Sequence, residues 1–217
     1  MPHVAHSEQI RLARMPDYGR VYTHIGRSAF DKGQYLRALR VLHEAIKRGA
    51  PAEAYKLRAC SYYELNRYEK ALADLNRYIG MQPQDPSAYV LRGEWRIVKG
   101  KYRAALEDFQ RARQLGPLPL GGLIGRGIAF LALEQYDKAI VDFSKARSLD
   151  PNCADALINL GVACLLSRRY LSAGKAFSKA LETTTNSAWR EKLRLWMSEL
   201  EKKPKRNIRP VPRGDER

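Results

Sequence analysis

Apolar and small residues recur along the chain in a pattern with a period of about 34 residues. Each period carries a tyrosine, an alanine three residues later and a large apolar residue four further on, as Tyr102, Ala105 and Phe109 illustrate. Leu106 extends the same stripe, because positions i, i+3, i+4 and i+7 share one face of an α-helix. Gly93 precedes the tyrosine by nine positions and falls in an earlier segment. The pattern therefore predicts pairs of helices joined by a short turn.

The same pattern occurs five times. The tyrosines are Tyr35, Tyr68, Tyr102, Tyr136 and Tyr170, spaced by 33 residues once and by 34 residues three times. The small residues before them are Gly26, Ala59, Gly93, Gly127 and Gly161, and the large residues after them are Leu42, Leu75, Phe109, Phe143 and Phe177. Repetition with a period of about 20 to 50 residues is typical of stacked structural units.

These positions resemble the tetratricopeptide repeat (TPR) family, and the match covers about residues 19–187. The resemblance implies an all-α, right-handed superhelical solenoid of five helix-turn-helix repeats. The repeats are expected at about 19–51, 52–85, 86–119, 120–153 and 154–187. Small residues would let the two helices of a repeat approach closely, and the large residue would fill the space between them.

A capping helix is expected at residues 188–202, because the last helix of a repeat array would otherwise leave its apolar side uncovered. Four apolar residues recur there at helical spacing: Trp189, Leu193, Trp196 and Leu200. Residues 1–18 are expected to form an N-terminal extension. Residues 203–217 are basic and contain three prolines, so we expect a disordered tail.

The sequence predicts neither an enzyme nor a cofactor or metal site. It lacks the HExxH, GxSxG and P-loop motifs. The four histidines lie in the first fifth of the chain without cysteines or carboxylates at ligand spacing: His3, His6, His24 and His43. The glycine-rich run 121–127 falls inside an expected helix, whereas a dinucleotide-binding loop must follow a strand. Close helix packing is the simpler reason for these glycines.

Length and composition favour a folded chain of 217 residues, 45% of them hydrophobic and 29% charged. Residues 157–166, its longest mainly apolar stretch, are too few to span a membrane, which requires about 20 residues. Three cysteines form no CxxC pair, and the first residues do not resemble a secretory signal. We therefore expect an intracellular protein, most simply a cytoplasmic one, while cytoskeletal, ciliary or organellar association stays open.

The net charge of +16 favours acidic partners. Three arginines share one repeat position and three aspartates follow each of them by sixteen residues: Arg58, Arg92 and Arg126 with Asp74, Asp108 and Asp142. Repeats one and five lack both residues, which predicts an ion pair between the two helices of a repeat. The remaining basic residues would form a surface on repeats one and three: Arg37, Arg40, Lys47, Arg48, Lys99, Lys101 and Arg103.

The TPR resemblance implies that the first helices of the repeats line a concave groove that binds extended peptides or a partner helix. In repeats three to five the predicted groove is aliphatic: Val90, Leu91, Ile97, Ile124, Ile128, Leu131, Ile158, Val162 and Leu165. Part of this set must also be core, because these helices pack sideways on their neighbours. The predicted partner is a protein with an extended or helical apolar segment.

TPR proteins that bind Hsp70 or Hsp90 tails use a two-carboxylate clamp of lysine, asparagine and arginine side chains. The corresponding positions here are Thr23, Arg27, Leu57, Ser87 and Leu91, or, shifted by one repeat, Lys56, Cys60, Leu91, Gly121 and Gly125. Neither set supplies the clamp, which argues against a chaperone-tail receptor. The sequence therefore predicts a non-catalytic scaffold or adaptor within a larger complex. The alternative is an RNA- or ribonucleoprotein-associated factor that uses the basic surface.

Overall fold

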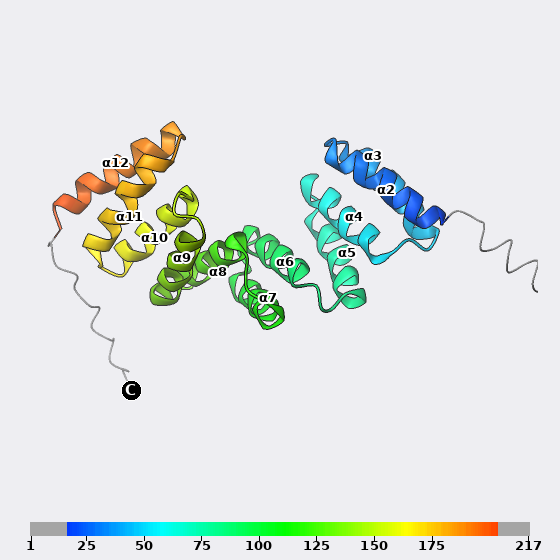
Figure 1. The fold of residues 1–217 in the computed structure, drawn as a ribbon, viewed down its shortest axis with the longest axis horizontal. Helices are drawn as coiled ribbons and strands as arrows, with labels where there is room; N and C mark the ends of the chain where they lie inside the picture. Colours follow the sequence, from blue (N-terminus) through cyan, green and yellow to red (C-terminus); the bar gives the residue numbers. More distant parts are fainter. Residues whose placement is uncertain (1–16, 204–217) are drawn as a thin grey trace, which may run out of the picture. The chain divides into compact units, whose positions relative to one another are not determined.

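The computed structural model of the chain describes residues 17–203, and every regular element within that range is an α-helix. The helices are α2 (Tyr18–Asp31), α3 (Tyr35–Lys47), α4 (Ala52–Glu64), α5 (Tyr68–Met81), α6 (Pro86–Val98), α7 (Tyr102–Leu115), α8 (Leu120–Ala132), α9 (Tyr136–Leu149), α10 (Ala154–Leu166), α11 (Tyr170–Thr183) and α12 (Ser187–Glu201). From α2 to α11 they form consecutive pairs, each joined by a turn of three residues (Figure 1). The prediction of an all-α repeat fold is confirmed.

The described residues fall into two units, one ending at Ala88 and the other beginning at Tyr89. The first unit holds α2 to α5, and the second holds most of α6 together with α7 to α12. The predicted N-terminal extension lies outside the described residues except for Asp17 and Tyr18. The predicted tail lies outside them except for Lys203.

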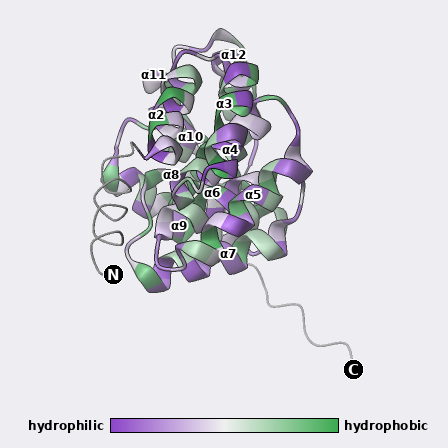
Figure 2. Ribbon diagram, turned by 90° about the vertical axis from the view of Figure 1, so that its right-hand side faces the viewer, coloured by the Kyte–Doolittle hydropathy of each residue, from purple (hydrophilic) through white to green (hydrophobic). Residues whose placement is uncertain are grey.

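Hydrophobic and hydrophilic residues alternate along the helices, which Figure 2 shows as green and purple bands on single ribbons. The apolar side of each helix packs on its neighbours, and the polar side faces water. Helices α8 and α10 differ from the rest because most of their residues are apolar or small. No helix within residues 17–203 combines the length and apolar character needed to cross a membrane.

The two helices of a pair pack closest where a small residue of the first helix faces a large residue of the second. A Cβ atom added to Gly127 would lie 2.6 Å from Cε1 of Phe143, whose side chain is completely buried. The same contact joins Gly26 to Leu42, Gly93 to Phe109 and Gly161 to Phe177. The second pair has Ala59 and the smaller Leu75 at these positions, both fully buried. The small residue therefore leaves the space that the buried side chain of its partner fills.

Each turn within a pair contains one residue in the left-handed conformation, two positions before the tyrosine that begins the next helix. Its φ is +69° at Gly33 and Gly100, +57° at Asn66, +58° at Glu134 and +60° at Arg168. The next backbone N–H reaches back to the preceding helix, as Gln135 N donates to Phe130 O at 2.8 Å. These bonds close Schellman turns. Glycine and asparagine suit this conformation, whereas Glu134 and Arg168 adopt it at a cost of about 1–2 kcal/mol each.

Helix α12 covers the apolar side of α11. Leu193 is completely buried, and the ring of Trp196 lies 5.2 Å from that of Phe177. The side chain of Asn186 caps the helix by accepting a hydrogen bond from the Trp189 backbone N–H at 3.1 Å. Trp189 itself remains partly exposed. The last repeat pair is therefore not left with a bare apolar surface.

Replacing Gly127 with alanine should destabilise the second unit. The added methyl group would overlap the buried Phe143 ring, and overpacking of this kind costs about 1–3 kcal/mol. The variant Gly127→Ala/Phe143→Leu reproduces the Ala59 and Leu75 combination of the second pair and should recover part of this loss. Urea unfolding followed by circular dichroism measures both changes.

Gly174 on α11 provides the matched control, because a Cβ built there meets no atom within 4 Å other than its chain neighbours and the backbone of its own helix. The same substitution, Gly174→Ala, should stabilise the protein by about 0.5–1 kcal/mol, since alanine loses less backbone entropy than glycine in a helix. Equal effects of the two substitutions would show that helix propensity, and not the contact with Phe143, decides the result.

Candidate partner-binding face

Three buried ion pairs connect the two helices of repeats two, three and four. Arg58 Nε and Nη2 donate to both carboxylate oxygens of Asp74, at 2.6 and 2.8 Å. Arg126 binds Asp142 in the same way, at 2.7 and 2.6 Å. The aspartates are almost completely buried, and such bidentate pairs hold both side chains in a fixed geometry. The predicted pairing within each repeat is confirmed.

The pair in repeat three has an additional arginine. Arg92 Nη2 lies 2.6 Å from one oxygen of Asp108, and Arg96 Nη1 lies 2.8 Å from the other. Arg96 also donates to the backbone oxygen of Ala104 at 2.8 Å. These arginines are therefore committed to the interior of their own repeats and do not form a ladder for an external phosphate chain.

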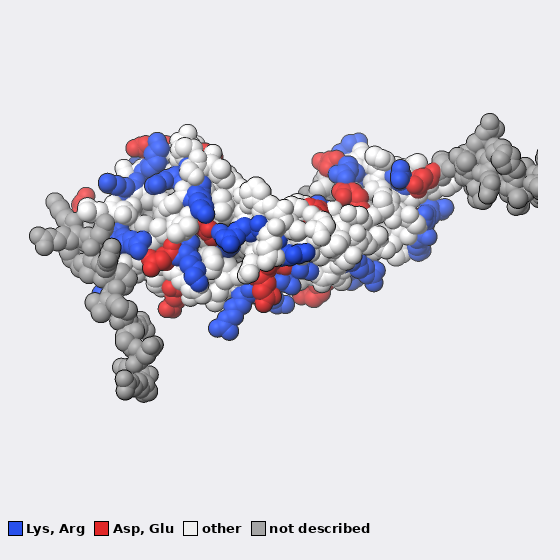
Figure 3. Space-filling view, turned by 60° about the horizontal axis from the view of Figure 1, so that its bottom comes forward, with Lys and Arg blue, Asp and Glu red and all other residues white. Residues whose placement is uncertain are grey.

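The seven basic residues predicted as a surface are all exposed. Three of the four in the first unit make local contacts: Arg37 with Gln34, Lys47 with Glu44, and Arg48 over the ring of Tyr22. In the second unit, Lys99 and Lys101 lie in the turn before α7 and Arg103 lies in its first turn. Figure 3 shows lysine and arginine side chains distributed over the visible face, with acidic side chains among them. No single basic patch dominates that view.

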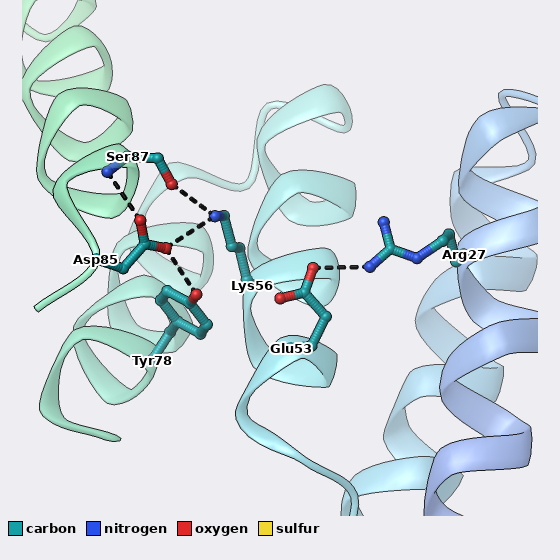
Figure 4. Close-up of polar contacts among 6 residues, drawn as sticks. All are labelled: Arg27, Glu53, Lys56, Tyr78, Asp85 and Ser87. Carbon is teal, nitrogen blue, oxygen red and sulfur yellow. Dashed lines mark hydrogen bonds and ion pairs between the residues drawn. The ribbon is translucent and has the colours of Figure 1, made fainter. Parts of the chain in front are cut away.

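Polar side chains on the first helices of unit one are paired with one another (Figure 4). Arg27 Nη2 lies 2.8 Å from Glu53 Oε1. Lys56 Nζ contacts Asp85 Oδ2 at 3.1 Å and Ser87 Oγ at 2.8 Å. The cations that this face could offer to a carboxylate ligand thus already have acidic partners.

Asp85 is the centre of this network. Burial would raise the pKa of its carboxyl group, but hydrogen bonds from Ser87, Tyr78 and Lys56 outweigh burial and lower the pKa to about 2. The Tyr78 hydroxyl donates to Asp85 Oδ2 at 2.7 Å. Asp85 therefore stays ionised at neutral pH and holds Lys56 in place.

The chaperone clamp is not assembled at the positions where the family has it. Thr23 is buried and donates its hydroxyl to Gly19 O at 2.7 Å, and Leu57 is buried. Arg27 and Lys56 are held by the carboxylates described above. No asparagine occupies any of the corresponding positions, so two free carboxylates of a ligand would find no matching set of donors.

The aliphatic residues predicted to line the groove lie on the first helices α6, α8 and α10, all in the second unit from Tyr89 onward. The first helix of each repeat is its A helix, and we call this set of residues the A-helix face: Val90, Leu91, Ile97, Ile124, Ile128, Leu131, Ile158, Val162 and Leu165. Val90 and Ile158 are 8% and 5% exposed and belong to the core, whereas the other seven are half-buried. Ile124, Ile128 and Leu131 pack against the same cluster of buried residues as Val162 and Leu165. Helices α8 and α10 thus pack on one shared core cluster, and these five side chains remain partly exposed.

The glycines of α8 are explained by packing. A Cβ atom on Gly125 would lie 2.7 Å from Cζ of Phe109, and Gly127 faces Phe143 as described above. Gly121 differs, because its missing side chain leaves room for a carboxylate. Glu94 Oε1 lies 3.2 Å from the position where its Cβ would be.

Glu94 is a residue of this face that the sequence reasoning missed. It lies eight residues before the tyrosine of its repeat, the position that Ile128 and Val162 occupy in theirs. The signal was present in the sequence as one acidic residue at a position that is Arg27 and Cys60 in repeats one and two and is aliphatic in repeats four and five. A pocket of about 300 Å³ between α11 and α12 was also missed; it is lined by Tyr170, Leu171, Gly174, Met197 and Leu200 among others.

Residues 17–203 contain no group of three histidine, cysteine or acidic side chains placed to hold a metal ion. Burial raises the pKa of the Cys60 thiol to about 11. This thiol is therefore protonated at neutral pH and is a poor nucleophile.

The tetratricopeptide repeat model matches the chain at residues 24–86, 56–119, 96–143 and 124–188. The chain belongs to the tetratricopeptide repeat family. A search of curated proteins finds no sequence that matches this TPR protein significantly.

Solved structures with the same fold include several bacterial proteins. MamA 41-end from Desulfovibrio magneticus RS-1 is 22% identical, with a TM-score of 0.72 over 78% of this chain and 96% of that one. Pseudomonas aeruginosa PilF is 15% identical, with a TM-score of 0.74 over 86% and 85%. YrrB, described as a TPR protein with an unusual peptide-binding site, is 19% identical, with a TM-score of 0.69 over 80% and 90%. At these identities the likeness concerns the fold.

Removing one side chain of a buried ion pair should lower the stability of the fold more than removing both side chains. Arg126→Leu leaves the buried Asp142 carboxylate without its partner and should destabilise the protein by about 3–5 kcal/mol. The double variant Arg126→Leu/Asp142→Ala carries the residues of the fifth repeat, Leu160 and Ala176, and should recover most of that loss. Urea unfolding of the single and double variants gives the coupling energy. Additive effects would mean that the two side chains do not depend on each other.

Proposed function

We propose that this TPR protein is a non-catalytic scaffold or adaptor that binds a partner segment on its A-helix face and acts within a larger complex. The observation that carries the proposal is the half-buried aliphatic surface shared by α8 and α10. Ile124, Ile128, Leu131, Val162 and Leu165 all contribute to it. Contiguous apolar surface that remains accessible typically marks an interaction site.

The contrast with the polar residues supports this choice. The arginines of repeats two to four are bound to aspartates inside their repeats, and Arg27 and Lys56 are bound to acidic side chains. These cations on the first helices thus already have acidic partners, whereas the aliphatic side chains of α8 and α10 stay partly exposed. YrrB, which has the same fold, is described as having a peptide-binding site, and this supports a peptide segment of a partner as the ligand of this protein.

The proposed partner presents an apolar segment, extended or helical. Apolar residues at alternate or helical spacing would fill the surface between α8 and α10, as in other complexes in which a helix or strand is recognised by its side chains. Exposed lysines and arginines outside the face would increase the rate of association with an acidic partner and add little to affinity at physiological salt.

The test compares the full-length protein with the double variant Ile128→Asp/Val162→Asp. The two introduced carboxylates would face the apolar segment of the partner without ion-pair or hydrogen-bond partners. The affinity for the partner should therefore fall at least roughly tenfold, which corresponds to about 1.4 kcal/mol. Val141→Asp on α9 is the matched control, because Val141 is 53% exposed and lies outside the face. Binding is measured by recovery of proteins from untreated and nuclease-treated lysates in parallel pull-downs with the three proteins.

Folding and the competing explanation are controlled in the same experiment. Helical content and melting temperature must match the wild type, and Ile128→Thr/Val162→Thr provides a milder variant if aspartate unfolds the chain. Partners retained by the folded double variant would contradict the proposal. Partners lost after nuclease treatment, or on raising salt from about 50 to 200 mM, would instead indicate phosphate contacts and an RNA-associated factor that uses the basic surface.

A further inference from the structure

The Glu94 carboxylate is the one acidic group at the central position of the A-helix face. By repeat position it corresponds to Ile128 on α8 and Val162 on α10. Its side chain reaches toward the first turn of α8, where Oε1 lies 3.2 Å from the Cβ position of Gly121. A side chain at position 121 would contact this carboxylate closely, so the glycine leaves it more room.

Glu94 differs from Glu53 and Asp85 of unit one because it makes no ion pair or hydrogen bond within residues 17–203. Glu53 is bound by Arg27, and Asp85 is bound by Lys56, Ser87 and Tyr78. The Glu94 side chain is half-buried, and burial raises the pKa of its carboxyl group. A carboxylate that is partly removed from water without a partner is destabilised relative to the same group in solution.

We propose that the partner segment carries one lysine or arginine among its aliphatic residues and that this cation pairs with Glu94. This inference rests on the proposed function and adds the chemistry of the ligand to it. A cation at this place would compensate the lost hydration of the carboxylate, and the aliphatic residues on either side of it would pack against Ile124, Ile128 and Val162.

The overall positive charge of the chain disfavours a basic ligand. A preference for a basic peptide would therefore distinguish the proposed pair with Glu94 from attraction by net charge. The chain carries a net charge of +16 and should attract acidic peptides at a distance. Charges farther away than about 8 Å are screened at physiological salt, whereas a half-buried contact pair is not. If this basic protein prefers peptides that contain a lysine or arginine, the preference must therefore come from a nearby acidic side chain.

The test selects ligands from a random library of 12-residue peptides displayed on phage, using the full-length protein immobilised at about 150 mM salt, near physiological ionic strength. Peptides are collected whose binding depends on Ile128 and Val162. They should contain a lysine or arginine at one position between aliphatic residues. Glu94→Gln removes the charge with little change of shape and should weaken their binding roughly tenfold or more, since hydrogen bonds to charged groups are the stronger class.

Glu107→Gln is the matched control, because Glu107 lies on α7, is exposed and takes part in no ion pair among the described residues. It makes the same change in net charge and should leave binding unaltered. Selected peptides without a preferred basic position, or peptides that bind wild type and Glu94→Gln equally, would overturn the pairing but leave the A-helix face intact as a binding site. A library that yields no peptide dependent on Ile128 and Val162 would overturn both proposals.

Discussion

The close contact between a small residue on the first helix and a large residue on the second is the constraint on which the repeats depend. Gly127 against Phe143 is the clearest case, because a single methyl group on the glycine would overlap a fully buried ring. The contact sets the distance between the paired helices. Once that distance is fixed, the remaining apolar residues of the first helices are divided between sideways packing and surface. The A-helix face consists of residues of α6, α8 and α10 that do not fill the contact between the paired helices.

The close packing of the two helices in a repeat also determines which polar side chains can be buried between them. Repeats two, three and four place an arginine and an aspartate where they meet across the pair, and both are removed from water together. Buried pairs of this kind contribute little net stability but are costly to break, so they enforce which side chains may lie at these positions. Repeats one and five omit both partners and use Ile25 with Val41 and Leu160 with Ala176. Each buried aspartate of these repeats thus has at least one arginine partner, whereas the half-buried Glu94 has none among the described residues.

Much of this could be predicted from the sequence, because each repeat serves as a control for the others. The joint presence of Arg58 with Asp74, and the joint absence of both in repeat five, predicted the ion pairs. Other features had no such signal. Glycine at positions 33 and 100 suggests a left-handed turn, but Glu134 and Arg168 adopt the same conformation only because the surrounding repeat geometry imposes it. Burial of Val90 and Ile158 depends on how neighbouring helices cross, which spacing along the chain does not determine.

The measurement that tests the binding face most directly is a methyl NMR titration of the full-length protein, labelled at isoleucine Cδ1, with a peptide that it binds. Isoleucines occur both on the A-helix face and elsewhere in the described residues. Binding on the face should shift the methyl signals of Ile97, Ile124 and Ile128 and leave those of Ile25, Ile46 and Ile79 unchanged. Shifts confined to the second group, which lies on α2, α3 and α5, would place the ligand on the first unit and contradict the assignment of the A-helix face.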